Sequence, residues 1–365
     1  MSTLTRREWL VAAPAVAACG FARSAPPAAD VKAVVEKAVA FLGTKQNEDG
    51  SLAPKLGGPG ITALTVAGLL RHNFTSESPV VTKGLAYLEK NIQKDGGVYQ
   101  KGLANYTTCL AIVTFKEANT GGKYTKIIAD AGKFVQGLQD SSDPKDVKHG
   151  GVGYDGKGRP DLSNTQFMVE ALLAAGVSKD DPSIKKAMAF VSRSQNLPGE
   201  YNDQPFAAKA TEDDKGGFVY NPTNPDDPKN DKRTAAGGLR SEGGMTYAGL
   251  KSFLYAGVGK DDKRVQAALA WIKKHYTLSE NPGNGQAGLY YYYHTFAKAM
   301  DALGEEMFED AKGVKHDWRQ ELFDALKTAQ KDDGRWENAN TAFLENQPEL
   351  ATAFAVLALS YCTQK

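Results

Sequence analysis

The segment GLAYLEKNIQKDGGVYQ, residues 84–100, decides the fold because its pattern recurs along the chain. An amphipathic run is followed by a glutamine, by one or two glycines and then usually by an aromatic residue. Related segments begin near residues 38, 131, 187, 268 and 322. Every copy except the one at 268 contains the glutamine, at Gln46, Gln93, Gln139, Gln195 and Gln330. Such repetition is typical of folds built from stacked supersecondary units.

Each repeat is predicted to form a helical hairpin. In its first helix, Leu85 and Leu88 lie on an apolar stripe, whereas Lys83 and Glu89 belong to a charged face. The second run, such as LATAFAVLALSYC at residues 350–362, is apolar on nearly every side and should be buried. Runs that alternate β-branched and polar residues are almost absent, so an all-α protein without a significant β-sheet is expected.

The hairpins are expected to close into a ring. The last apolar run ends near the C-terminus without a polar cap, whereas open solenoids usually need polar terminal repeats. We therefore predict an α/α toroid of about six hairpins over residues 30–365. Each repeated glutamine, at the end of one helix, can satisfy backbone groups of the next.

Residues 1–29 are predicted to be an export signal. The pair Arg6-Arg7 and the weakly apolar run behind it resemble a twin-arginine signal. The stretch VAAC, residues 16–19, resembles a lipobox that would make Cys19 the lipidated first residue; cleavage near Ser24 or Ala25 is the alternative. Both readings place the mature protein in the periplasm or cell envelope. A formal net charge of +1 gives no indication of a nucleic-acid partner.

The repeated glutamine, glycine and aromatic residue resemble the QW repeats of squalene–hopene cyclases and related triterpene cyclases. The β subunits of protein prenyltransferases share this type of toroid. The resemblance extends from about Val31 to the C-terminus. It implies an apolar, isoprenoid-like ligand in the central cavity.

The resemblance also implies candidate catalytic residues, of which the first is Asp161. Cyclases of the hopene type begin the reaction with a DxDD motif, and the similar segment here is RPDLSNTQF, residues 159–167. Asp161 matches an acidic position, but Ser163 and Asn164 stand where further aspartates would be needed. A lone carboxylate is not easily made acidic enough to protonate an alkene. The alternative reading is that Asp161 caps a helix.

Protein prenyltransferases hold zinc with Asp, Cys and His, and two segments resemble that site. His294, in YHTFAKAMDALG, falls on the histidine position. Glu242, in RSEGGMTYAGL, falls on the carboxylate position, and Gly244 replaces the cysteine. Zinc bound by His294, Glu242 and a third ligand such as Asp161 is therefore one possibility, without the soft ligand. The alternative is a hydrogen-bonded His294 near the mouth of the ring.

The run YYYYHTF, residues 290–296, is expected to begin the fifth inner helix. Adjacent residues on a helix are separated by about 100° and cannot share one face. Tyrosines suit the rim of a cavity because each has an apolar body and a polar tip. We expect the cavity to be lined by Tyr292 or Tyr293 with His294, and at the same level by Thr62, Thr107, Asn164, Gln166, Thr246 and Tyr247.

A long insertion, at about 196–242, interrupts the fourth pair of helices and ends next to Glu242. It is rich in Pro, Asp, Lys and Gly and is longer than a compact connection needs. A lid or wall of the cavity is one interpretation, and a plain surface excursion is the other.

Three functions remain open at this point. The first is a cyclase- or prenyltransferase-like protein that binds an isoprenoid or other apolar ligand. The second is a polysaccharide-active enzyme of the lyase kind, with Asn164, Arg240, Tyr292 and His294 in catalytic roles. The third is a binding or scaffold protein that keeps the ring without chemistry.

Overall fold

The computed structural model describes residues 25–75, 77–223 and 231–363. Arg6, Arg7 and Cys19 therefore lie outside the described residues. Within these described ranges, six inner helices surround the axis, namely α3 (Gly60–Arg71), α5 (Ala104–Glu117), α7 (Leu162–Ala174), α10 (Gly243–Tyr255), α12 (Leu289–Leu303) and α14 (Pro348–Leu359). Six outer helices cover them, namely α1 (Ala28–Lys45), α4 (Pro79–Lys90), α6 (Thr125–Leu138), α8 (Pro182–Arg193), α11 (Lys263–His275) and α13 (Trp318–Ala329).

The smaller elements lie in the connections. They are α2 (Pro54–Gly57), α9 (Pro205–Ala208), the 3₁₀ turns at Thr120–Gly122 and Ala342–Leu344, and an antiparallel pair of two-residue strands, β1 (Phe308–Glu309) and β2 (Lys315–His316). In the described part of the chain, no helix is both long and apolar enough to cross a bilayer.

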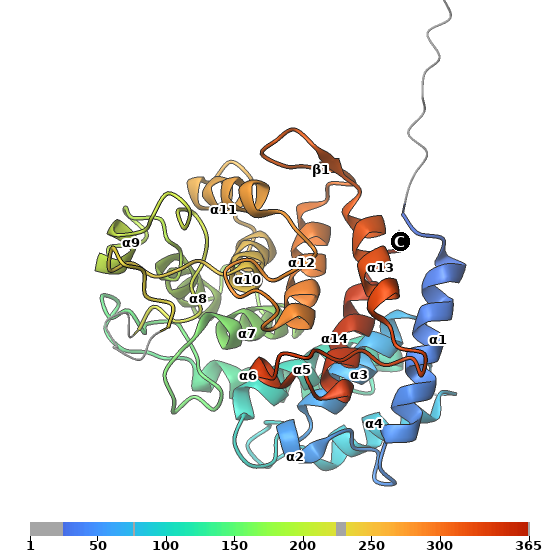
Figure 1. Cartoon of the computed structure of the whole chain (residues 1–365). Coiled ribbons are helices and arrows are strands. Elements are labelled where there is room, and N and C mark those ends of the chain that lie inside the picture. Colours follow the sequence, from blue (N-terminus) through green and yellow to red (C-terminus); the bar gives the residue numbers. More distant parts are fainter. Residues whose placement is uncertain (1–24, 76, 224–230, 364–365) are drawn as a thin grey trace, which may run out of the picture.

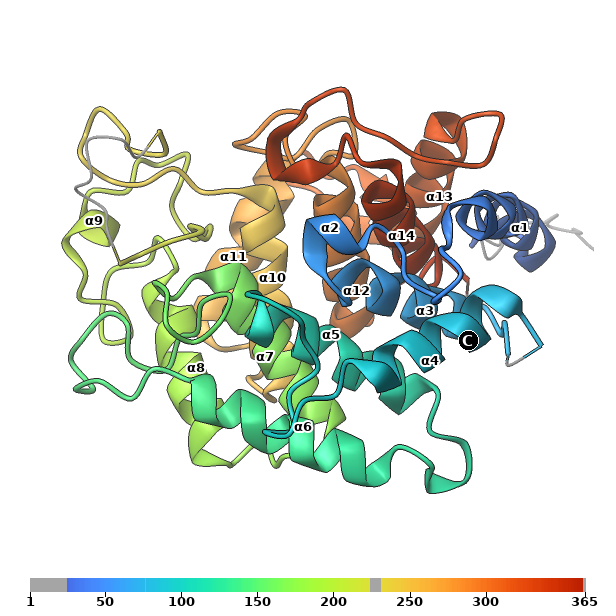
Figure 2. The same cartoon turned by 90° about the horizontal axis from the view of Figure 1, so that it is seen from below.

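The ring is closed. Each inner helix packs against the next in the order α3, α5, α7, α10, α12 and α14, and α14 packs back against α3. The first outer helix, α1, contacts both α14 and α4. Figures 1 and 2 show the blue N-terminal hairpins beside the red C-terminal ones, which completes the circle. The predicted α/α toroid is confirmed.

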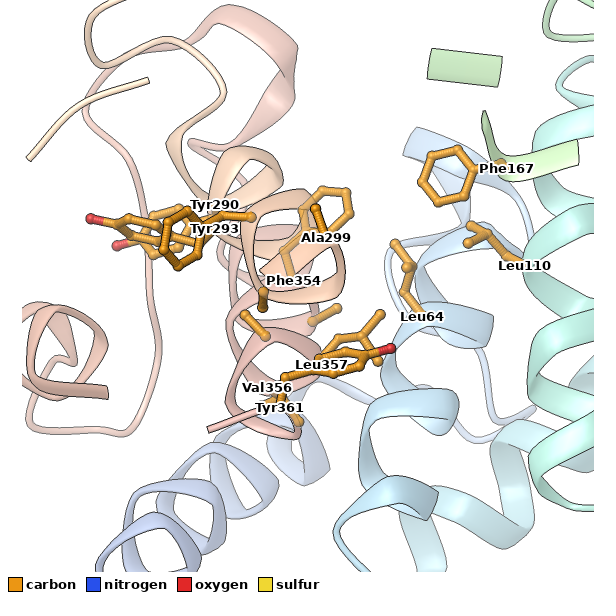
Figure 3. Packing of buried hydrophobic residues seen from close by; sticks show 14 of the residues in the cluster. Leu64, Leu110, Phe167, Tyr290, Tyr293, Ala299, Phe354, Val356, Leu357 and Tyr361 are labelled. Atoms are coloured by element: carbon orange, nitrogen blue, oxygen red, sulfur yellow. The ribbon is translucent and has the colours of Figure 1, made fainter. Parts of the chain in front are cut away.

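Burial explains the two kinds of helix. Residues 350–359 of α14 are all buried, which agrees with its uniformly apolar sequence. The outer helix α6 buries only a stripe that includes Ile128, Ala131 and Val135. Side chains from α3, α7 and α14, such as Leu64, Phe167 and Phe354, meet in the core (Figure 3).

Four of the repeated glutamines fasten one hairpin to the next. In four copies the side-chain amide donates two hydrogen bonds of 2.8–3.0 Å, one to a loop glycine carbonyl and one to a carbonyl of the next outer helix. The acceptors are Gly50 and Val80 for Gln46, Gly150 and Ser183 for Gln139, Gly216 and Arg264 for Gln195, and Gly334 and Val34 for Gln330. The bond from Gln330 reaches α1 and so joins the last repeat to the first.

In five of the six motifs, a glycine with a positive φ lies against the backbone of the next outer helix. Gly150 has a φ of +84°, and a Cβ there would lie 1.9 Å from the carbonyl oxygen of Lys186 in α8. Gly334 repeats this arrangement at the ring closure, with a φ of +91° and the carbonyl oxygen of Lys37 at 2.2 Å. Only glycine permits both the left-handed conformation and this approach.

The insertion forms a small structure of its own. Phe206, Ala207, Val219 and Leu239 make an apolar cluster separate from the main core. At its end, the backbone N–H of Ser241 donates to the carboxylate of Asp214 over 2.8 Å. The chain is thus held in place immediately before Glu242.

Removal of one glutamine clamp should weaken the ring. Gln195 is fully buried, so Gln195→Ala leaves two carbonyls without this donor and should lower the free energy of unfolding by about 2 kcal/mol. Urea denaturation followed by circular dichroism measures the change. Gln266→Ala, at an exposed position of α11, is the matched control and should have almost no effect; equal effects would show that the clamp contributes nothing special.

Candidate functional site

A pocket of about 400 Å³ opens where the inner helices begin. Much of its wall is apolar and comes from α2, α3, α14 and the loops beside them: Leu56, Ile61, Leu103, Leu350 and Phe354. Phe343 and Leu344, which are 57% and 47% exposed, stand at its edge. Polar groups enter from the side of α7 and α10: Ser163, Tyr220, Glu242, Asn281 and Asn284. A cavity at the mouth of the ring agrees with the sequence expectation.

Of the four consecutive tyrosines, Tyr291 is the one that lines the pocket, and the prediction of Tyr292 or Tyr293 was wrong. The Tyr291 hydroxyl lies 3.0 Å from the Ser163 hydroxyl, across the pocket wall. Tyr292 and Tyr293 instead donate to the carbonyls of Thr277 and Leu278, both over 2.6 Å. Their rings therefore turn toward the outer layer of the toroid.

The predicted threonines do not face the lumen, and the residues that do face it come one position earlier in the sequence. Thr62 and Thr246 accept the backbone N–H groups of Leu52 and Phe218, and Thr107 donates to the Val98 carbonyl. These hydroxyls hold the motif loops against the inner helices. The pocket is lined by the residues just before them, Ile61, Met245 and Tyr106.

The remaining predicted lining residues are buried beside the pocket. Asn164 donates to the carboxylate of Asp161 over 2.8 Å. Tyr247 packs edge-to-face on Tyr292 and Phe296. Gln166 lies deeper, where it accepts a hydrogen bond from Lys251. None of these three belongs to the lining of the described pocket.

His294 lies beneath the pocket and is completely buried. Its ring stacks on Phe354 and Phe167, with centroids 5.4 and 6.1 Å away. Neither ring nitrogen has a hydrogen-bond partner among the described residues, so the expected hydrogen-bonded histidine at the mouth is not found. Burial and two nearby lysines hold its pKa well below the usual value, which keeps the ring neutral.

The candidate zinc ligands do not come together. Among the described residues, no group of three or more His, Cys, Asp or Glu side chains is placed to hold a metal ion. Asp161 and Glu242 each have their own amide partner, Asn164 and Asn284. His294 faces aromatic rings. The residues present do not fit a zinc site of the kind proposed from His294, Glu242 and Asp161.

Asp161 caps α7, as the alternative reading predicted. Its carboxylate accepts the backbone N–H of Asn164 over 2.8 Å. Burial raises its pKa to about 6, against the effect of these hydrogen bonds. Asp161 lines an adjoining surface cleft rather than the pocket, and Tyr154 and Tyr220 lie in the walls of both.

Glu242, just before α10, is the predicted candidate that does line the pocket. Asn284 Nδ2 donates to its Oε2 over 2.6 Å, and Lys232 Nζ lies 3.9 Å from its Oε1. Burial raises the pKa of Glu242, and Lys232 opposes the shift. Since the lining residues Tyr220 and Glu242 both come from the insertion, the insertion forms part of the pocket wall.

A buried ionic cluster deeper on the axis was missed from the sequence. The carboxylate of Glu170 in α7 forms ion pairs with two lysines. Its Oε2 lies 2.7 Å from Nζ of Lys251 in α10, and its Oε1 lies 2.6 Å from Nζ of Lys298 in α12. Its side chain and those of both lysines are at most 8% exposed. The available signal was a charged residue in the middle of each of these three largely apolar runs. Although burial alone would raise it, the lysines hold the pKa of Glu170 well below its usual value.

The fold and pocket define a closed α/α toroid with a ligand-sized cavity at one end. Comparison of sequences agrees: the squalene-hopene cyclase C-terminal domain family matches residues 53–212. The resemblance to terpenoid cyclases inferred from the repeats is thereby confirmed. No curated protein sequence matches the chain.

Solved structures are similar to the chain at low sequence identity, and the first two named here share its fold. A possible member of the GH105 family from Salmonella enterica serovar Paratyphi A has a TM-score of 0.54 at 11% identity, covering 92% of this chain and 94% of its own. A D-mannose isomerase has a TM-score of 0.52 at 14% identity, covering 92% and 99%. A type II terpene cyclase from Scytonema has a TM-score of 0.34 at 15% identity, covering 92% and 98%.

Removing the acid of the ionic cluster should be far more harmful than removing one base. Glu170→Gln leaves two buried lysines unpaired and should cost about 3–5 kcal/mol of unfolding free energy. Lys298→Met should cost much less, because Lys251 still neutralises Glu170. Denaturation of both variants at neutral pH tests this order, and the reverse order would contradict the assigned pairing.

The same cluster predicts a pH effect. Burial lowers the pKa of Lys298 from 10.5 to about 7, against the attraction of Glu170. Between these values the unfolded chain binds more protons than the folded one, so this lysine makes stability rise with pH. The unfolding free energy of the protein relative to Lys298→Met should therefore increase from pH 7 to pH 10. A constant difference would show that Lys298 keeps its proton in the fold.

Proposed function

We propose that the protein binds an apolar, isoprenoid-like ligand in the pocket at the mouth of the toroid. The observation that carries the proposal is the pocket itself, about 400 Å³ in volume and walled largely by aliphatic and aromatic side chains. Small-molecule sites usually measure roughly 300–1,000 Å³ and combine an apolar lining with a few polar groups.

The aromatic wall supports a preformed site. Tyr106 packs edge-to-face on Phe167 at 5.2 Å, and Tyr291 packs on Phe354 at 5.7 Å. These contacts connect α5, α7, α12 and α14 around the opening. Rings held in this way offer apolar surface at little cost in conformational entropy.

The charges of the lining favour an uncharged ligand over a prenyl diphosphate. Glu242 and Glu345 line the described pocket, whereas no lysine or arginine does. Phosphate groups are usually bound by Arg, Lys or a metal ion. Transfer from a diphosphate therefore receives no support from these walls, and binding is the function that the geometry favours.

Three of the residues expected to act in the polysaccharide alternative are not available to a substrate in the pocket. Asn164 is paired with Asp161, Tyr292 faces the Thr277 carbonyl, and His294 has no exposed surface. A proton-abstracting centre needs such groups within reach of the substrate. The two neighbours named for sugar chemistry support the fold only.

Filling the pocket should abolish binding. Leu350, at the start of α14, is 9% exposed and lines the apolar wall. Leu350→Trp should lower the affinity for N-phenyl-1-naphthylamine, a neutral fluorescent probe, by about tenfold or more. Farnesene should displace the probe from the unaltered protein.

The matched control is Val314→Trp, which adds the same side chain at a 50% exposed position between β1 and β2. It should bind the probe as the unaltered protein does. Equal binding by both variants, or no displacement by farnesene, would contradict a ligand site in this pocket.

We further propose that the protein acts outside the cytoplasm, in the periplasm or cell envelope. The twin-arginine-like segment supports this placement. Replacement of Arg6 and Arg7 by lysine should leave the protein uncleaved in the cytoplasm, as measured by cell fractionation. Metabolic labelling with a fatty acid, lost in Cys19→Ser, would identify a lipoprotein; export without labelling would favour cleavage near Ser24.

A further inference from the structure

The pocket is polar on one side and apolar on the other. In the order of the ring, α10 stands opposite α3. Glu242 and Met245 come from the α10 side, and Asn284 from the loop that leads into α12. Ile61 and Leu56 face them from α3 and α2. The carboxylate of Glu242 and the amide of Asn284 therefore lie on the wall that faces the aliphatic side chains of Ile61 and Leu56.

The side chain of Asn281 already makes hydrogen bonds within the protein. Its Oδ1 accepts the N–H of Gly244 over 2.9 Å, and its Nδ2 donates to the Ala287 carbonyl over 3.0 Å. These bonds hold the loop 281–287 against the start of α10.

The Glu242–Asn284 pair can make further hydrogen bonds. Glu242 Oε1 is buried without a hydrogen-bond partner among the described residues, and the side chain is only 6% exposed. Asn284 Nδ2 spends one N–H on Glu242 Oε2. A buried acceptor left without a donor destabilises the protein, and a ligand group that donates a hydrogen bond would relieve this cost.

The surrounding charges indicate which group that is. Lys232 already provides a cation, with Nζ 3.9 Å from Glu242 Oε1, so a positive head group is not needed. A carboxylate or phosphate would be repelled by Glu242. A neutral hydroxyl donates to a carboxylate and can accept from an amide N–H.

We infer that the ligand is an apolar molecule with one terminal hydroxyl group, which binds the Glu242–Asn284 pair while its chain lies against Ile61 and Leu350. The inference rests on the proposed function, because it names the class of ligand for the same pocket. Glu242 acts here as the residue that selects the head group.

A series of C15 probes tests the inference by displacement of N-phenyl-1-naphthylamine: farnesol, its methyl ether, farnesene, farnesoic acid and farnesylamine. Farnesol should bind at least about tenfold more tightly than farnesene or the ether, since only farnesol can donate a hydrogen bond to the charged carboxylate. Glu242→Leu should remove this preference, so that the variant binds farnesol and farnesene with equal affinity. Glu306→Leu, at an exposed position, should keep the preference.

The outcomes separate the inference from the proposed function. Equal affinity for farnesol and farnesene, or tightest binding of the acid or the amine, would overturn the hydroxyl assignment while leaving an apolar site. Absence of binding by every probe would overturn both. The comparison of probes uses the unaltered protein, so it decides the matter even if Glu242→Leu fails to fold.

Discussion

Closure of the ring is the constraint on which the rest of the structure depends. An inner helix such as α14 is buried at ten successive residues, 350–359, and needs a neighbour on every side. A linear stack would leave α3 and α14 each with a bare apolar face. The contact of α14 with α3 and the bond from Gln330 to the Val34 carbonyl remove both faces at once. The described pocket exists because this closure surrounds the axis.

Helical periodicity then arranges the axis in layers. Tyr291, His294 and Lys298 are spaced three and four residues apart on α12 and so lie on one face. The first lines the pocket, the second stacks below it on Phe354, and the third binds Glu170. The ionic layer closes the axis beneath the aromatic one. The described pocket is thus confined to the mouth, where helix N-termini and motif loops supply the polar groups.

The toroid could be predicted from the sequence, because the glutamine and glycine of the motif make backbone contacts that recur from repeat to repeat. The site was harder to predict, because the predicted lining residues lay one position away from the residues that face the pocket. Thr62, Thr107 and Thr246 were expected to face the lumen, but their hydroxyls hold the motif loops, and Ile61, Tyr106 and Met245 line the pocket instead. A shift of one residue turns a side chain by about 100°. Glu170 was missed because its two partners are on other helices, far apart in sequence.

Tyr291, in the run of four adjacent tyrosines, accounts for the small residues at two positions where the resemblance implies catalytic or metal-binding groups. Ser163 and Gly244 stand where the resemblance implies a cyclase aspartate and a prenyltransferase cysteine, and both line the pocket. Both are also neighbours of Tyr291: its hydroxyl bonds Ser163, and its ring would lie 3.4 Å from a Cβ at residue 244. Tyr292 and Tyr293 anchor the same turn outward to residues 277 and 278. The small residues and the tyrosine fit one another, so the space that would hold an acid or a thiolate is filled by an aromatic wall suited to holding a ligand.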